Sequence, residues 1–134
     1  MMEERPLFFH EILENGLIVE VRDLSRRYFG DYHRVVLEVL IRLPLRMELL
    51  AAAPDAETLL AAARTAWGEE ARNDTRLERM GVAGADVDSV RGELWTSFVA
   101  HGFGYIQHPE YPARLLRRLL AQRKTSRPHL RVLS

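Results

Sequence analysis

The chain has 134 residues, of which 47% are hydrophobic and 28% are charged, values typical of one globular domain. The net formal charge of zero argues against a global attraction to nucleic acid or an anionic membrane, and the absence of cysteine excludes disulfides, thiolate metal sites and cysteine nucleophiles. No run approaches the roughly 18 apolar residues that cross a bilayer, and residues 1–6 lack the apolar segment of a signal peptide, so we expect a cytoplasmic protein without membrane insertion.

Two apolar runs, residues 7–13 and 17–24, flank Asn15 and Gly16. Asn-Gly tolerates the positive φ angles of a tight turn, so this pattern predicts a β-hairpin. With Asn15 and Gly16 as the two turn residues, Leu13 faces Ile18 across the hairpin. The core face is then expected to hold Phe8, His10, Ile12, Val19 and Val21.

Residues 35–49 carry an apolar side chain at every second position, with mostly charged residues between them. Side chains alternate across a strand, so this stretch predicts one long strand with an apolar face. Pro44 cannot donate a ladder hydrogen bond, and we expect the strand to bend there and continue to residue 49.

A second hairpin should join residues 17–24 to this long strand, and the side chains favour one register. A three-residue loop over residues 30–32 places Val21 opposite Ile41 and Glu20 opposite Arg42. The second pair has opposite charges, which stabilises neighbouring strands. The first three strands therefore form an antiparallel meander.

The chain after residue 49 is mainly helical in pattern. Asp55 can cap a helix over residues 56–67, and Gly68 can end it. Residues 69–80 combine helix-forming charged residues with an alternation that suits a strand. We favour a short fourth strand near residues 71–80, because the long strand would otherwise leave an exposed edge.

Residues 81–84 are expected to form a loop, and Asp86 to cap a second helix with apolar residues at helical spacing. This helix should end near residues 101–102, with a loop or short extended piece over residues 103–108. A last helix begins at two prolines, which the first helical turn tolerates. It should end before a tail over residues 126–134.

These elements predict a single α+β domain over residues 1–134. An antiparallel β-meander occupies residues 6–49, and the possible short strand near residues 71–80 gives the sheet three to four strands in all. About three α-helices packed on the sheet follow within residues 55–125.

The outer face of the predicted sheet carries apolar side chains between its charges. Monomers seldom leave a contiguous apolar patch exposed. Either helices cover both faces of the sheet or a second copy covers this one, and we expect a homodimer. The apolar residues on this face are Phe9, Leu13, Ile18, Val36 and Leu40.

The densest polar and aromatic cluster is the tip of the second hairpin. Its candidate contact residues are Arg26, Arg27, Tyr28, Asp31 and His33. Rings that stack on bases beside guanidinium groups that bind phosphate can hold single-stranded nucleic acid. Asp31 near His33 could also orient the imidazole for acid–base work. The alternative is a plain hairpin tip whose aromatic residues cover the end of the core.

The second candidate surface is the last helix, because residues 114–131 are almost purely basic. Arg117 and Arg118 lie on its polar side. Such a helix can bind nucleic acid, an anionic membrane surface or an acidic partner. It can equally be the surface helix of a globular domain.

The sequence contains no catalytic constellation. None of the five histidines falls in a metal-ligand spacing, and Ser89 and Ser97 lack the surroundings of a nucleophile. We therefore expect no catalytic residue, no metal and no cofactor.

Three segments, residues 16–23, 28–33 and 77–82, resemble small uncharacterised bacterial proteins of about this length. The resemblance implies a compact fold and ordered structure near residues 75–80. It implies no activity and no site residue.

Three hypotheses for the function follow. The first is a non-catalytic protein-interaction or binding domain that self-associates. The second is a nucleic-acid-binding protein that uses the hairpin tip and the basic helix. The third is a small ligand-binding protein or enzyme with its site near residues 28–33.

Overall fold

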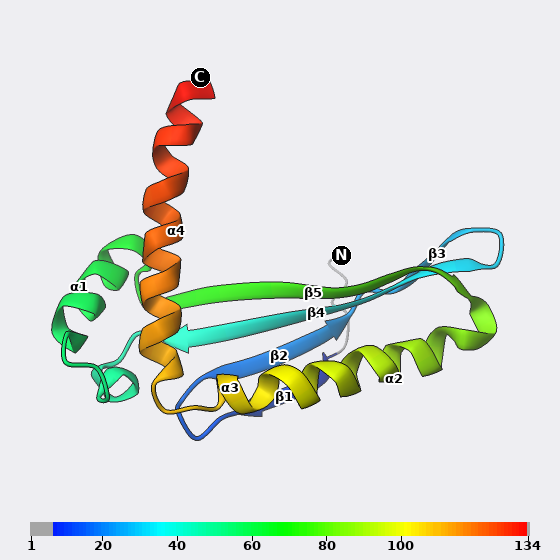
Figure 1. The fold of residues 1–134 in the computed structure, drawn as a ribbon, viewed down its shortest axis with the longest axis horizontal. Helices are drawn as coiled ribbons and strands as arrows, with labels where there is room; N and C mark the ends of the chain where they lie inside the picture. Colours follow the sequence, from blue (N-terminus) through cyan, green and yellow to red (C-terminus); the bar gives the residue numbers. More distant parts are fainter. Residues whose placement is uncertain (1–6, 134) are drawn as a thin grey trace, which may run out of the picture.

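The computed structural model describes residues 7–133, with side chains up to residue 123. It confirms the α+β class: an antiparallel sheet carries α-helices packed against it (Figure 1). The strands are β1 (Leu7–Ile12), β2 (Ile18–Asp23), β3 (Arg26–Phe29), β4 (Tyr32–Pro44) and β5 (Glu70–Ala83). The helices are α1 (Ala56–Trp67), α2 (Val87–Phe98), α3 (Gly104–Ile106) and α4 (Tyr111–Leu133), with shorter helical turns at Met47–Leu50, Gly84–Asp86 and Val99–Phe103.

The central strand of the sheet is β4. It pairs with β2 and β3 along one side and with β5 along the other, while β1 pairs with β2. β2 and β3 behave as one strand that is interrupted at Leu24 and Ser25. The Val36 N–H donates to the Ser25 hydroxyl at 2.9 Å, which replaces a ladder hydrogen bond at the interruption.

The predicted register of the first hairpin is wrong by one residue. Ile12, rather than Leu13, lies opposite Ile18. The turn is wider than a two-residue turn, because the Leu13 N–H donates to the Leu17 carbonyl at 2.8 Å. The Asn15 side-chain amide donates instead to the carbonyl of Ile106 at 2.8 Å, which ties the turn to the end of α3.

This one-residue shift exchanges the two faces of β1, because side chains alternate along a strand. Phe9 packs against the core, and Leu13 is buried. Two residues predicted for the core face, His10 and Ile12, are exposed instead, Ile12 at 65% of its surface. Phe8 is also exposed, but beside the bulge between Leu7 and Phe9 its ring still packs edge-on against Trp95, with the ring centres 5.7 Å apart.

The second hairpin differs from its predicted register by two residues. Val21 lies opposite Val39, not Ile41. The turn is tighter than predicted, with Phe29 opposite Tyr32, and a bulge in β3 takes up the difference. A shift of two residues leaves every side chain on its predicted face. The apolar face of β4 is therefore buried as expected, at Val39, Ile41 and Leu43.

The long strand ends at Pro44, and the turn at Met47–Leu50 replaces the predicted continuation to residue 49. The favoured fourth strand is confirmed and is longer than predicted, because β5 pairs with β4 along nearly all of its length. Residues 81–83 belong to β5 and do not form a loop. Gly81, with a φ of +68°, lies at a bulge that lets the strand continue to Ala83.

α1 matches its predicted bounds. The second helix does not end near residues 101–102, since a π-helical turn and α3 continue it to Ile106. The predicted loop is therefore wrong over residues 103–106, where Phe103 and Ile106 are buried on the side facing the core. Residues 107–108 do form a turn, as expected. α4 continues to Leu133, so the predicted tail is helical that far, while residue 134 lies outside the described part.

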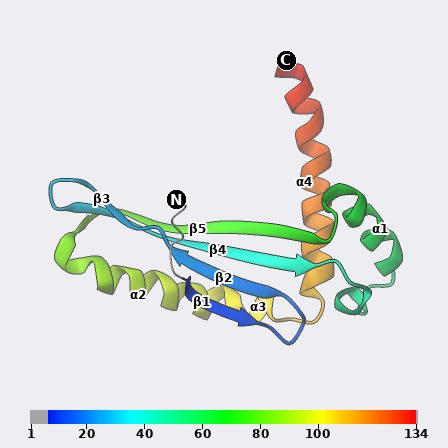
Figure 2. The same ribbon diagram turned by 180° about the vertical axis from the view of Figure 1, so that it is seen from behind.

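α2 lies across the core face of the sheet, whereas α1 and α4 pack at the end where β4 finishes (Figure 1). Phe9 holds β1 against this layer, with its ring centre 4.9 Å from that of Trp95 and 5.9 Å from that of Phe103. Figure 2 shows, from behind, that α4 continues well past β5. Within residues 7–133, no helix is both long and apolar enough to cross a membrane.

Gly16 is the turn position at which an added methyl group should be most harmful. Its φ is +94°, and a Cβ atom there would lie 2.6 Å from Cγ of Leu49. Backbone strain and overpacking should lower the free energy of unfolding of Gly16→Ala by roughly 2 kcal/mol or more in urea denaturation. Gly30→Ala, with a φ of +55° and open space around it, should lose only about 1 kcal/mol. Equal decreases in the free energy of unfolding for Gly16→Ala and Gly30→Ala would contradict a role for the contact with Leu49.

Candidate functional site

The first predicted site, at the β3–β4 hairpin tip, projects from one end of the molecule (Figure 1). Arg26 and Arg27 are exposed there. Three aromatic rings of the tip are also largely exposed, at 48% for Tyr28, 73% for Phe29 and 51% for Tyr32. The aromatic residues therefore do not cover the end of the core, which was the alternative interpretation of this cluster.

Asp31 and His33 are held by contacts within the fold. The Gly84 N–H donates to the Asp31 carboxylate and to the Asp31 carbonyl, each at 3.1 Å. His33 Nδ1 lies 3.1 Å from the same carbonyl, which is its hydrogen-bond contact with Asp31. Asp31 therefore fixes the tip to the segment that leads into α2, and it does not orient the imidazole through its side chain.

The second predicted site lies at the other end of the molecule, so Arg117 and Arg118 do not join the hairpin tip in one surface (Figure 1). Arg118 is exposed. Arg117 donates to the Asp55 carboxylate at 2.7 Å. This hydrogen bond lowers the pKa of Asp55 below its ordinary value, so the charge of Arg117 is compensated within the fold.

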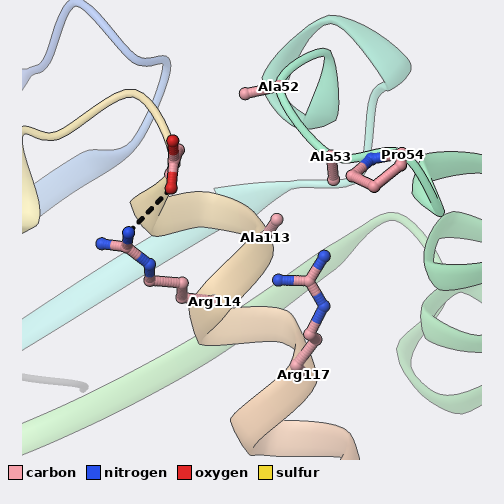
Figure 3. A pocket seen from close by; sticks show the side chains of 7 residues that line it. Ala52, Ala53, Pro54, Ala113, Arg114 and Arg117 are labelled. Atoms are coloured by element: carbon pink, nitrogen blue, oxygen red, sulfur yellow. Dashed lines mark hydrogen bonds and ion pairs between the residues drawn. The ribbon is translucent and has the colours of Figure 1, made fainter.

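A shallow hollow of about 300 Å³ lies between α4 and the segment before α1. Figure 3 shows Arg114 and Arg117 on its α4 side and residues 52–54 opposite. Arg114 donates to Glu110 at 2.7 Å. Both arginines of the hollow thus have carboxylate partners, which weakens their attraction for an anionic ligand.

The outer face of the sheet is a network of ion pairs. Arg42 donates to Glu20 at 2.9 Å and to Glu70 at 2.9 Å. These hydrogen bonds raise the pKa of Arg42, and those from Arg42 lower the pKa of Glu70. The network continues with Arg72–Glu70, Arg34–Glu78 and Arg76–Glu38.

The apolar patch predicted on this face is therefore reduced. Phe9 and Leu13 belong to the core side because of the shifted first hairpin, and Val36 is buried. Only Ile18 and Leu40 of the predicted set remain half-buried there, among the ion pairs. The same shift brings Ile12 to this face, opposite Ile18 and largely exposed, so the apolar surface that remains for a second copy is a short strip formed by Ile12, Ile18 and Leu40.

The edge of the sheet offers a different kind of surface. Within the described sheet, β5 pairs only with β4, so its other side is open. Val36 donates its N–H to Ser25 and accepts from the Leu24 N–H at 2.8 Å, so both of its main-chain groups point toward β2 and β3. Main-chain groups alternate between the two sides of an antiparallel strand. The neighbouring residues of β4, such as Leu37 and Val39, therefore direct theirs to β5.

The same alternation fixes which residues of β5 face the open side. Leu77 and Thr75 lie opposite Leu37 and Val39, so their N–H and C=O groups are used by β4. The residues between them direct these groups outward, and their side chains are exposed on the outer face of the sheet: Arg72, Asp74, Arg76 and Glu78. We call these four residues the edge set.

Sequence reasoning identified β5 as a strand but did not consider it as a site. The available signal was the charge alternation, since acidic and basic residues follow each other at every second position from Glu70 to Glu78. Among the described residues, no group of three or more potential ligands is placed to hold a metal ion. Comparisons with protein-family models, curated proteins and solved structures gave no match.

The Arg42–Glu70 pair should make the fold sensitive to acid. Because the pKa of Glu70 is lowered in the folded state, the pair stabilises the fold above the ordinary glutamate pKa, and this stabilisation is lost as the pH falls through the lowered value. When the pH is lowered from about 5 to about 3, the free energy of unfolding should therefore decrease less in Glu70→Gln than in the wild type.

Urea denaturation across this pH range measures the difference. Glu48→Gln is the matched control, because Glu48 is exposed on the turn after β4, and it should keep the wild-type acid sensitivity. The same pH dependence in Glu70→Gln and the wild type would contradict a stabilising role for the pair.

Proposed function

We propose that this protein is a non-catalytic protein-interaction domain that self-associates, and that it does so by adding a strand to the open edge of β5. The observation that carries the proposal is the row of outward main-chain groups at the edge set. An extended chain that pairs with such an edge gains main-chain hydrogen bonds for affinity, and its side chains supply specificity.

The length of the edge supports this function. β5 runs over Glu70–Ala83 without a proline. Natural sheets usually protect an edge by short strands, prolines, inward charges or a covering element. In the described part of β5, a bulge at Gly81 and charged side chains of alternating sign protect the edge. The bulge lies near the end of the strand, so the edge from Glu70 to Glu78 stays open to a chain of complementary charge.

Proline substitution tests this edge. Arg76→Pro removes an outward N–H and should leave the hydrogen bonds from β5 to β4 in place. We expect the wild type to sediment as a dimer at micromolar concentration and Arg76→Pro to sediment as a monomer with unchanged circular dichroism.

The control is His10→Pro on β1, the other edge of the sheet. The Leu13–Leu17 hydrogen bond and the β1–β2 register place the His10 N–H on the open side of β1 by the same alternation. This variant should still dimerise. A wild type that remains monomeric at these concentrations contradicts self-association.

Nucleic-acid binding remains the second candidate, and the exposed rings beside two arginines at the tip favour it. A fluorescent single-stranded oligonucleotide should then bind with an affinity that falls steeply with salt. Arg26→Ala and Arg27→Ala should each reduce the salt slope by about 1, whereas Arg118→Ala at the far end should not change it. Binding that is absent or independent of salt would reject this candidate.

A small-ligand or catalytic site near residues 28–33 has less support. It would use Tyr28, Asp31 and His33. The Asp31 carboxylate already accepts from the Gly84 N–H, and His33 Nδ1 already lies against the Asp31 carbonyl.

A further inference from the structure

We infer that the partner of β5 is the β5 strand of a second copy, paired antiparallel with Thr75 on the two-fold axis. This inference rests on the proposed function and adds the identity and the register of the added strand. The result is one continuous sheet built from two molecules.

The charges of the edge set favour this register, although Arg72, Arg76 and Glu78 also form ion pairs within the fold. With Thr75 on the axis, Asp74 of each copy lies opposite Arg76 of the other. In the same way Arg72 lies opposite Glu78. Each pair occurs twice by symmetry, and cross-strand pairs of opposite charge stabilise neighbouring strands.

The neighbouring registers are disfavoured. An axis at Asp74 places Arg72 opposite Arg76 and Asp74 opposite itself. An axis at Arg76 places Asp74 opposite Glu78 and Arg76 opposite itself. Like charges directly opposite each other are destabilising, so a shift of the axis by one residue in either direction replaces attraction with repulsion.

Registers two residues away keep opposite charges but lose part of the pairing. An axis at Asn73 pairs Arg72 with Asp74 and leaves Glu78 opposite Gly68, outside the strand. An axis at Leu77 pairs Arg76 with Glu78 and leaves Asp74 opposite Met80. The axis at Thr75 is the one of these five that gives every member of the edge set an oppositely charged partner.

The main-chain geometry agrees with this register. In it, residues of the edge set oppose one another, so outward N–H and C=O groups meet outward groups. Thr75 directs its own N–H and C=O groups to β4 and therefore forms a non-hydrogen-bonded pair with Thr75 of the second copy.

α4 crosses β5 and continues beyond the edge (Figure 1), so it would extend toward a second copy paired there.

Cysteine cross-linking measures the register directly. The chain has no cysteine, so each variant carries a single thiol. In a non-hydrogen-bonded antiparallel pair the Cα atoms are about 4.5 Å apart, which a disulfide can bridge. Thr75→Cys should form a covalent dimer under mild oxidation, seen as a band of doubled mass on a non-reducing gel and lost on reduction.

Asn73→Cys and Leu77→Cys are matched controls on the same face of β5. In the proposed register each lies roughly 13 Å from its own copy, by the rise of a strand, which is beyond the reach of a disulfide. Both should stay unlinked. Cross-linking at either control position in place of Thr75→Cys, or equally at all three, overturns the register.

Charge reversal gives an independent measurement. Asp74→Arg and Arg76→Asp should each weaken the dimer by about tenfold or more at low salt, because each creates two like-charge pairs. The double variant should restore the wild-type affinity, and the two single variants mixed together should form a heterodimer. With the axis at Asn73, Asp74→Arg would instead set an arginine opposite Arg72, so the double variant would remain weakened.

These outcomes separate the two proposals. A wild type that dimerises, without cross-linking at Thr75→Cys and without rescue by the double variant, overturns the register and leaves self-association standing. A wild type that is monomeric throughout the micromolar range, with no cross-link at any of the three positions, removes both.

Discussion

The division of hydrogen bonds along β4 is the constraint on which the rest of the structure depends. Val36 uses both of its main-chain groups toward β2 and β3, so the residues on either side of it serve β5. The same alternation decides which side chains enter the core, and it decides which residues of β5 face outward. One local contact, from Ser25 to Val36, therefore has consequences at the open edge of the sheet, two strands away.

The sequence was most informative where periodicity repeats and least informative at the turns. The face of β4 was predictable because its alternation extends over many residues, so an error of two residues in pairing Val21 left every side chain on its predicted face. The first hairpin was mispredicted because Asn15 and Gly16 suit a two-residue turn, whereas the Asn15 amide binds the carbonyl of Ile106. That partner lies 91 positions away in the chain, and no local pattern can indicate it.

The candidate sites show the same limit. The hairpin tip was predicted from its composition, and the structure does expose Arg26, Arg27 and Tyr28. The pairing of Asp31 with Gly84, and of Arg117 with Asp55, depends on segments that meet only in the folded chain. The edge set was not predicted as a site, because a charged alternation becomes an interface only when the strand that carries it is known to be the last in its sheet.

The charges of β5 also limit unspecific pairing at its open edge. A long edge strand can pair with any exposed chain, and charged side chains lower that risk because they must be matched or left in water. Charges of alternating sign also restrict the register of pairing, which charges of one sign could not do. A two-fold axis on Thr75 places every charge of the edge set opposite a charge of the other sign, whereas an axis on Asp74 or Arg76 places like charges opposite each other. The same side chains that bind Glu38 and Glu70 across the outer face thus also restrict which strand the edge accepts, and the strand that fits them best is the one that carries them.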